Sequence, residues 1–223
     1  MAKRPVFYSI DNKPYYREEY IDFKFYPGFS YAQKQKSIRS LHEQYQICHP
    51  DRKALETSSK SNNPLGVALS AFNLKITTSL RSFSVECAFQ GSKVFENGGP
   101  YVDLLNASSH EAKKDIRLRE SGKIIGFNYF GIEFPLEPKD YFYNWLYINA
   151  LSKNEELAID ILDYDSFTDI EFNPEKSINC QAKAAAIYVG LCKQKQISTA
   201  LLSRMDFLNT VYGEGIYNTD YFV

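Results

Sequence analysis

The segment between Ser84 and Pro100 constrains the fold most, because it contains both the start signal and the stop signal of a helix. Ser84 precedes a run of helix-compatible residues, and its hydroxyl can accept a hydrogen bond from a backbone N–H of the first turn. The run ends at the sequence NGGP, residues 97–100, where glycine suits the end of a helix and proline cannot continue it. We therefore predict a helix over residues 85–95.

One face of this predicted helix carries an acid, an amide and an amine. With about 3.6 residues per turn, Glu86, Gln90 and Lys93 fall on one narrow stripe together with Asn97. Seven residues separate Glu86 from Lys93, which is about 10.5 Å along a helix axis. That is too far for an ordinary ion pair, but it suits two groups that flank a small ligand. The same stripe is also typical of a solvent-exposed helix face, and the spacing alone leaves both interpretations open.

The rest of the chain alternates between strand-like and helix-like patterns without a repeat or a linker. Strands are expected at 6–10, 20–26 and 66–76, and 123–134 is expected to form a strand pair or an extended loop. Helices are expected at 31–46, 108–122, 138–151, 155–164, 178–193 and 199–210. Ser108 and Glu111 have the spacing of a capping box at the start of the second of these helices. Loops are expected at 56–63 and 166–174. The pattern predicts one domain over residues 1–223, of α+β class, predominantly helical with a few short strands.

Composition excludes several classes of protein. The 223 residues carry 26 Lys+Arg against 27 Asp+Glu, so the chain is not a strongly basic nucleic-acid binder. A hydrophobic share of 44% excludes a disordered chain, and no apolar run reaches the roughly 18 residues that a membrane span needs. The four cysteines form no CxxC pair. We therefore expect no metal, no cofactor and no membrane contact, and a cytoplasmic location with free thiols.

The charge is unevenly distributed. Residues 1–130 carry 19 basic and 13 acidic residues, whereas residues 131–223 carry 7 and 14. Two interpretations remain: a patchwork of solvated faces, or a basic side that approaches phosphates beside an acidic side. Aromatic residues are also abundant, with 17 Tyr, 16 Phe and 1 Trp. Most should fill the core, but some near the motifs below should line a site for a purine.

Several segments resemble motifs of the NADAR superfamily, whose fold is YbiA-like, and they follow one another along the chain as those motifs do. The segment SVECAFQGSKVF (84–95) is similar to its signature helix, and LSAFN (69–73) is similar to its Leu-Ser-Asn-Phe segment, with Ala71 in place of Asn. DIEFNP (169–174) and KSINCQA (176–182) occupy the place of its C-terminal motif, although the usual Trp-Gly is absent. The resemblance is strongest over residues 23–194.

Four further segments resemble the subgroup encoded beside DNA-targeting, guanine-specific ADP-ribosyltransferase toxins. They are YPGFS (26–30), SSKS (58–61), GGPYVDLL (98–105) and FYNWLY (142–147). The resemblance implies an N-glycosidase that removes ADP-ribose from guanine bases of DNA and so acts as an antitoxin. Its implied partners are guanine-linked ADP-ribosylated DNA, expected to be single-stranded, and the cognate toxin. A metabolic N-glycosidase on a phosphoribosyl intermediate of riboflavin synthesis, or a non-catalytic ADP-ribose- or toxin-binding module, remains the alternative.

The resemblance also implies roles for individual residues. Lys93 is the expected nucleophile, which forms a Schiff base with the ribose, and Glu86 is its acid/base partner; Lys60 is the rival lysine. Asp169 or Glu171 is expected to steer the hydrolytic water. The remaining expected ligand-binding residues are Ser59, Lys60, Ser61, Ser70, Phe72, Gln90, Gly98, Gly99, Tyr101, Trp145, Glu171 and Asn179. For the serine-rich turn the alternative is an exposed loop, and for Trp145 it is core packing.

Overall fold

The largest sheet of the computed structural model, which describes residues 2–213, joins strands from distant parts of the chain. Its order is β2-β1-β9-β3, with β1 antiparallel to β2 and to β9, and β3 parallel to β9. The four strands are β1 (Ala2–Ser9), β2 (Tyr16–Phe23), β3 (Ala54–Glu56) and β9 (Ser166–Thr168). The prediction of a loop over 166–174 is therefore wrong at its start. A fully buried three-residue strand has no alternation of polar and apolar residues that would reveal it.

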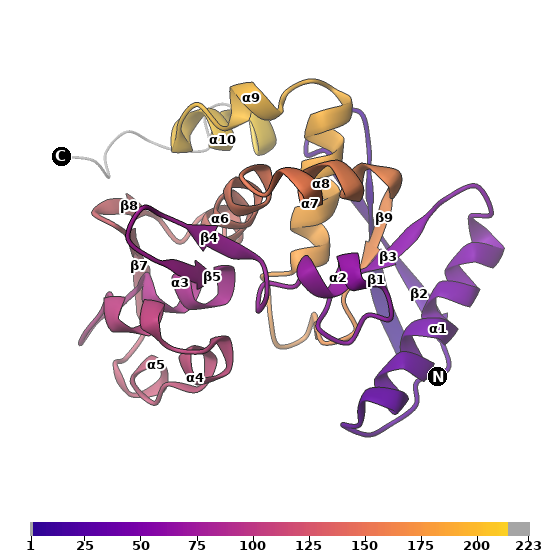
Figure 1. Cartoon of the computed structure of the whole chain (residues 1–223), viewed down its shortest axis with the longest axis horizontal. Helices are drawn as coiled ribbons and strands as arrows, with labels where there is room; N and C mark the ends of the chain where they lie inside the picture. The colour runs from indigo at the N-terminus through magenta and orange to yellow at the C-terminus, as the bar shows by residue number, and fades with distance from the viewer. Residues whose placement is uncertain (1, 214–223) are drawn as a thin grey trace.

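Helices cover both faces of this sheet (Figure 1). On one face lies α1 (Tyr31–Cys48), which begins at the N-cap Ser30 and buries Ile38, Leu41 and Tyr45 against β1 and β2. On the other lies α8 (Gln181–Lys193), which contacts β1, β9 and α6 (Tyr141–Ser152). The run of alanines in α8 is fully buried, so this helix packs closely on its neighbours.

The second half of the fold surrounds α3 (Val85–Gly91) and differs from the prediction at a decisive point. The expected helix over 85–95 ends at Gly91, and residues 93–95 form β6 (Lys93–Phe95). There Lys93 pairs with Phe127 of β7 (Ile124–Tyr129), which in turn pairs with β8 (Ile132–Phe134). Cross-strand pairing with a distant segment thus overrides the local helical pattern. The strand pair expected over 123–134 is confirmed.

The remaining short elements adjust several predictions. The strand expected at 66–76 is wrong: Asn63 caps α2 (Pro64–Ala68), and a turn then leads to β4 (Lys75–Thr77), which pairs with β5 (Ser82–Ser84). The capping box at Ser108 is confirmed, but two short helices replace the one expected over 108–122. The expected helices over 155–164 and 199–210 are each divided as well. The short helices in these parts of the chain are α4 (Ser109–Lys114), α5 (Arg117–Glu120), α7 (Glu155–Asp160), η2 (Ile161–Asp163), α9 (Ile197–Ala200) and α10 (Arg204–Val211). One further short helix, η1 (Val102–Asn106), precedes α4.

Aromatic rings form the core between α3, α6 and the β6-β7-β8 sheet. Phe142 stands 4.7 Å from Phe127 and 4.8 Å from Phe134 between ring centroids, and Phe89 lies 5.5 Å from Phe127. All four rings are buried. These rings belong to a larger set of aromatic side chains that are buried in the core. The fold is α+β and predominantly helical, as predicted. Within residues 2–213, no helix is both long and apolar enough to cross a bilayer.

Candidate active site

A chain of hydrogen bonds connects the acid, the amide and the amine that the sequence places on one stripe. The Gln90 amide donates from Nε2 to Glu86 Oε1 over 2.9 Å, and Lys93 Nζ donates to Gln90 Oε1 over 2.7 Å. Glu86 and Gln90 project from α3, whereas Lys93 projects from β6, so the turn at Ser92 brings them together. Glu86 and Gln90 are only 6% and 7% exposed, so the carboxylate is held in a mostly dry environment.

The Lys93 amine has an altered acidity. Burial lowers its pKa to about 8, the charge of Glu86 opposes this, and the positive charge of Lys113 adds to it. Its Nζ also lies 4.8 Å from the centroid of the Phe89 ring. Desolvation disfavours the charged ammonium and outweighs the attraction of Glu86. With a pKa of about 8, roughly a tenth of Lys93 is the neutral amine at pH 7, and only the neutral amine is a nucleophile.

Two glycines allow the chain to fold tightly around the backbone of Lys93. Gly99 has φ +84°, and a Cβ at this position would lie 2.3 Å from the carbonyl oxygen of Lys93. Gly98 accepts a hydrogen bond from Phe95 N at 2.8 Å, and a Cβ there would lie 2.4 Å from the Tyr101 hydroxyl. Gly98 and Gly99 thus fix where β6 lies and indirectly hold Lys93 in place.

A second acidic centre lies just beyond the end of β9. Burial and, to a smaller extent, the charge of Glu56 raise the pKa of Asp169 to about 7. Glu56 is itself 1% exposed, and burial raises its pKa as well. It accepts hydrogen bonds from Thr168 Oγ1 at 2.6 Å and from Ile170 N at 2.9 Å, the residues on either side of Asp169. Glu56 therefore anchors the backbone that carries Asp169.

Tyr143 and Lys113 connect the two centres electrostatically. Burial raises the pKa of Tyr143, and the charges of both Glu86 and Asp169 add to that effect. The charge of Lys113 lowers the pKa of Lys93 and also that of Asp169. Both centres therefore lie within the electrostatic reach of the same two residues.

The backbone of Ala71 joins the same two segments mechanically. Glu86 N donates to the Ala71 carbonyl over 2.9 Å, and Ala71 N donates to Gln181 Oε1 over 2.6 Å. Gln181 is the first residue of α8 and follows the loop that begins at Asp169. The start of α3 and the start of α8 are thereby tied to one residue.

Three members of this region were not predicted from the sequence. Lys113 lies beside Lys114 in a basic run, and Tyr143 is one of several aromatic residues in the segment FYNWLY, and neither pattern marks a site. Glu56 lies where a loop was expected, and a single glutamate there carries no recognisable signal. Its importance depends on the parallel pairing of β3 with β9.

Other predicted ligand-binding residues lie at the edges of this region. Ser59, Lys60 and Ser61 form a turn directly after β3, in which Ser61 N donates to the Ser58 carbonyl over 3.0 Å. Glu171 N donates to Asp169 Oδ1 over 3.0 Å, while its carboxylate pairs with Lys34 Nζ at 2.8 Å. The Oδ1 atom of Asn179 is buried without a partner among the described residues, which leaves an acceptor free for a ligand.

The remaining predicted residues serve the fold or lie apart. The Ser70 hydroxyl donates to the Val67 carbonyl over 2.8 Å and is buried. Tyr101 hydrogen-bonds Ser121 through its hydroxyl, and Trp145 packs 4.8 Å from Phe134 in the aromatic core. Phe72 is half-buried, and Lys113 Nζ lies 5.1 Å from the centroid of its ring.

The surroundings of this region were compared with the surface cavities and with possible groups of metal ligands among the described residues. Glu86 is buried and Lys93 is half-buried, and neither lines any of three surface cavities found among the described residues. No group of three or more His, Cys, Asp and Glu side chains stands ready to hold a metal ion within residues 2–213. The altered pKa values in this region belong to the Lys93 amine and to the carboxyl groups of Asp169 and Glu56.

Comparison with known proteins bears on the identity of the chain. A search of the curated proteins finds no match. The family model described as "DarT1-associated NADAR antitoxin" matches residues 2–220, nearly the whole chain. The match extends over both the large sheet and the region around α3 and Asp169. The chain therefore belongs to the family of DarT1-associated NADAR antitoxins.

Proposed function

We propose that the chain hydrolyses the N-glycosidic bond between ADP-ribose and guanine in DNA, and that Lys93 is the nucleophile. The observation that carries the proposal is the environment of Lys93, whose pKa burial lowers to about 8 and whose amine is oriented through Gln90 toward Glu86. The family supplies the antitoxin context and implies a cognate toxin, whose product this reaction would remove. The excess of basic residues in 1–130 suits an approach by DNA.

In the first step the neutral Lys93 amine attacks the anomeric carbon of the ribose. The C–N bond to guanine breaks as the new bond to nitrogen forms, and Asp169, whose pKa of about 7 keeps much of it protonated, gives its proton to the departing base. Glu86 takes the proton that Lys93 loses and passes it to the ring oxygen. The ring then opens and leaves an iminium, the Schiff base, on Lys93.

In the second step water releases the sugar. Asp169, now a carboxylate, takes a proton from a water molecule whose oxygen adds to the iminium carbon. The hydroxyl proton passes to nitrogen as the bond to Lys93 breaks, which frees the amine and gives the open aldehyde of ADP-ribose. The net reaction consumes one water, changes no oxidation state and returns each residue to its starting protonation.

The test is incubation with a single-stranded oligonucleotide that carries one ADP-ribosylated guanine. We expect release of free ADP-ribose and restoration of the unmodified strand. Lys93→Ala should lower kcat by at least about a thousandfold, because covalent catalysis by a positioned nucleophile is lost. Lys153→Ala, which alters an exposed lysine at the end of α6, controls for the loss of a charge.

Two outcomes would contradict the proposal. Modification that persists with the unaltered protein excludes the reaction, and turnover of a free phosphoribosyl compound in its place would favour the metabolic alternative. Activity that survives in Lys93→Ala but disappears in Lys60→Ala would make Lys60 the nucleophile. Circular dichroism of each variant establishes that a loss of activity is not a loss of fold.

A further inference from the structure

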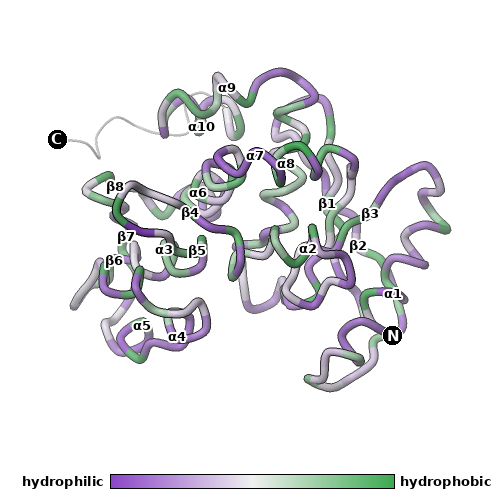
Figure 2. The backbone as a smooth tube through the Cα atoms, in the orientation of Figure 1, coloured by the Kyte–Doolittle hydropathy of each residue, from purple (hydrophilic) through white to green (hydrophobic). Residues whose placement is uncertain are grey.

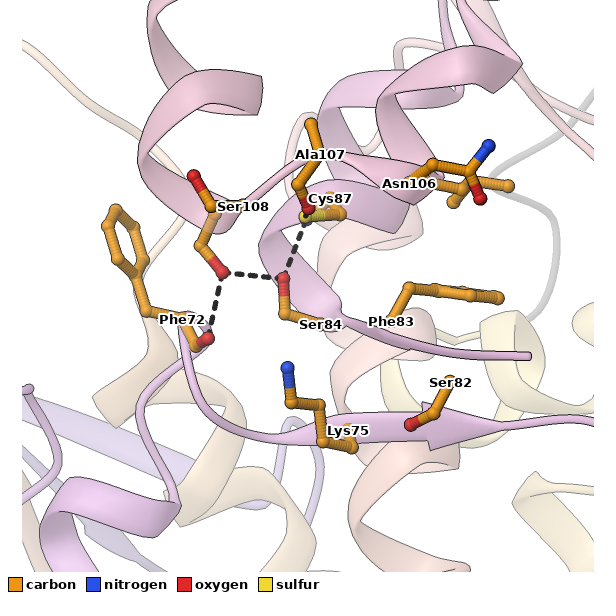
Figure 3. A pocket seen from close by; sticks show the side chains of 11 residues that line it. Phe72, Lys75, Ser82, Phe83, Ser84, Cys87, Asn106, Ala107 and Ser108 are labelled. Atoms are coloured by element: carbon orange, nitrogen blue, oxygen red, sulfur yellow. Dashed lines mark hydrogen bonds between the residues drawn. The ribbon is translucent and has the colours of Figure 1, made fainter.

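A polar cavity of about 470 Å³ opens beside α3, on a face of this helix that the proposed reaction does not use (Figure 3). Strand β4 contributes Lys75 and β5 contributes Ser82, while Asn106 and Ser108 close the opposite side. Phe72 forms one edge. Ammonium, hydroxyl and amide groups are the ones that proteins commonly use to contact phosphate oxygens.

The charges around this cavity favour an anion. Lys75 projects into the cavity and has no carboxylate within 4.0 Å among the described residues (Figure 3). At the rim, Arg81 donates to Asn106 Oδ1 over 3.3 Å. The carboxylate of Glu111 is engaged in its capping box, where it accepts a hydrogen bond from Ser108 N at 2.9 Å. The α4–α5 segment next to the cavity is mostly hydrophilic and contains several basic residues (Figure 2).

The cavity adjoins the candidate active site but is separate from it. Cys87 of α3 lines the cavity, whereas Glu86 and Gln90 point to the hydrogen-bonded chain on another face of the same helix. Phe72 stands at the boundary, because it lines the cavity and also packs beneath Lys113. Lys113 in turn acts on the acidities of Lys93 and Asp169. A ligand that reaches both places must therefore be long and must pass Phe72.

We propose that this cavity binds a backbone phosphate of the DNA strand that carries the modified guanine. Lys75, Ser82, Asn106 and Ser108 contact the phosphate oxygens, and the half-buried ring of Phe72 stacks on a neighbouring base. The inference rests on the proposed function for the identity of the strand. A phosphate could also belong to ADP-ribose itself, and the experiment below separates these two sources.

Direct binding tests the site without relying on catalysis. Fluorescence anisotropy with an unmodified single-stranded oligonucleotide gives Kd at several salt concentrations. Lys75→Ala should weaken binding several-fold and reduce the slope of log Kd against log salt by about 0.7, the value for one phosphate contact on a single strand. Ser82→Glu, which places a negative charge at an exposed strand position, should weaken binding further. Lys139→Ala, which removes an exposed lysine without an ion pair among the described residues, should leave the slope unchanged.

Kinetics then identify where the phosphate comes from. Lys75→Ala should raise KM for the ADP-ribosylated oligonucleotide several-fold at unchanged kcat, and should leave turnover of ADP-ribosylated guanosine unaltered. Equal losses on both substrates would assign the phosphate to ADP-ribose and overturn the inference. The inference would also be overturned if Lys75→Ala had the same Kd for DNA and the same salt slope as Lys139→Ala. If the unaltered protein binds DNA through Lys75 but releases no ADP-ribose, the proposed function fails while the phosphate site stands.

Discussion

At the scale of single residues, the chemistry of Lys93 reflects a competition between burial and charge. Glu86 raises its pKa, but burial is the larger effect and brings the pKa to about 8. Asp169 is altered in the other direction, since burial and Glu56 raise its pKa to about 7. The two values bring a neutral amine and a protonated carboxyl group into the same pH range, which acid–base catalysis requires.

These values predict a bell-shaped pH profile for kcat/KM. The active form needs Lys93 neutral, with a pKa of about 8, and Asp169 protonated, with a pKa of about 7. Activity should therefore rise up to about pH 7, reach its maximum between the two values and fall above about pH 8. Initial rates from pH 5.5 to 9.5 measure this profile. In Asp169→Asn the rates should be lower, and only the rising limb should remain. A falling limb that persists in Asp169→Asn would show that another group is the acid.

At the scale of elements, the junction between α3 and β6 decides where Lys93 lies. A helix continued to residue 95 would carry Lys93 on the stripe of Glu86 and Gln90, but β6 pairs with β7 and the chain turns at Ser92. The loop that returns along β6 contains Gly99, whose missing Cβ leaves room for the Lys93 carbonyl. This loop is therefore part of the support for the nucleophile.

Gly99→Ala tests this support, and the fold contains a matched control. Gly99 and Gly131 have nearly the same φ, +84° and +85°, but a Cβ at Gly131 meets nothing within 4 Å. Gly131→Ala should cost only the strain of a left-handed residue, about 1–2 kcal/mol of unfolding free energy. Gly99→Ala adds a clash with the Lys93 backbone, so it should cost more and should also lower kcat at least tenfold. Urea unfolding and initial rates measure both; equal effects of the two substitutions would remove the assigned role of Gly99.

Other elements show why sequence patterns reveal some parts of the site and not others. The capping box at Ser108 was predicted correctly because it depends on residues three positions apart. The sequence predicts that Glu86, Gln90 and Lys93 belong together, but it does not predict the geometry of their hydrogen bonds. That geometry depends on β6, which forms only with β7 as its partner. Glu56 and Asp169 meet through the pairing of β3 with β9, more than 100 residues apart in sequence, which no local pattern encodes.

At the scale of the whole molecule, the two buried carboxyl groups affect stability. Asp169 and Glu56 have raised pKa values, so the folded state binds their protons more tightly than the unfolded state does. Their contribution to stability is complete below the unfolded pKa of about 4 and is lost as pH rises through the folded pKa of Asp169, about 7. These two carboxyl groups therefore make the folded state less stable at the pH where the site is active than at low pH.

Thermal unfolding at pH 5 and pH 8 tests this cost. The contribution of Asp169 should make Tm fall between the two values, and Asp169→Asn should reduce the fall and raise Tm at pH 8. The control is Asp103→Asn, since Arg117 holds the pKa of Asp103 below its usual range and the carboxylate stabilises the fold when ionised. That variant should lose a little stability at pH 8. An Asp169→Asn protein less stable than the unaltered one at pH 8 would contradict the account.

The central claim is that Lys93 carries the ribose during the reaction, and trapping the intermediate tests it most directly. The protein is mixed with guanine-ADP-ribosylated oligonucleotide in the presence of cyanoborohydride, which reduces an iminium to a stable amine, and is then digested for mass spectrometry. The account predicts an ADP-ribose adduct on the peptide that contains Lys93, and none in Lys93→Ala. An adduct on Lys60, or complete turnover with no adduct on any lysine, would contradict it.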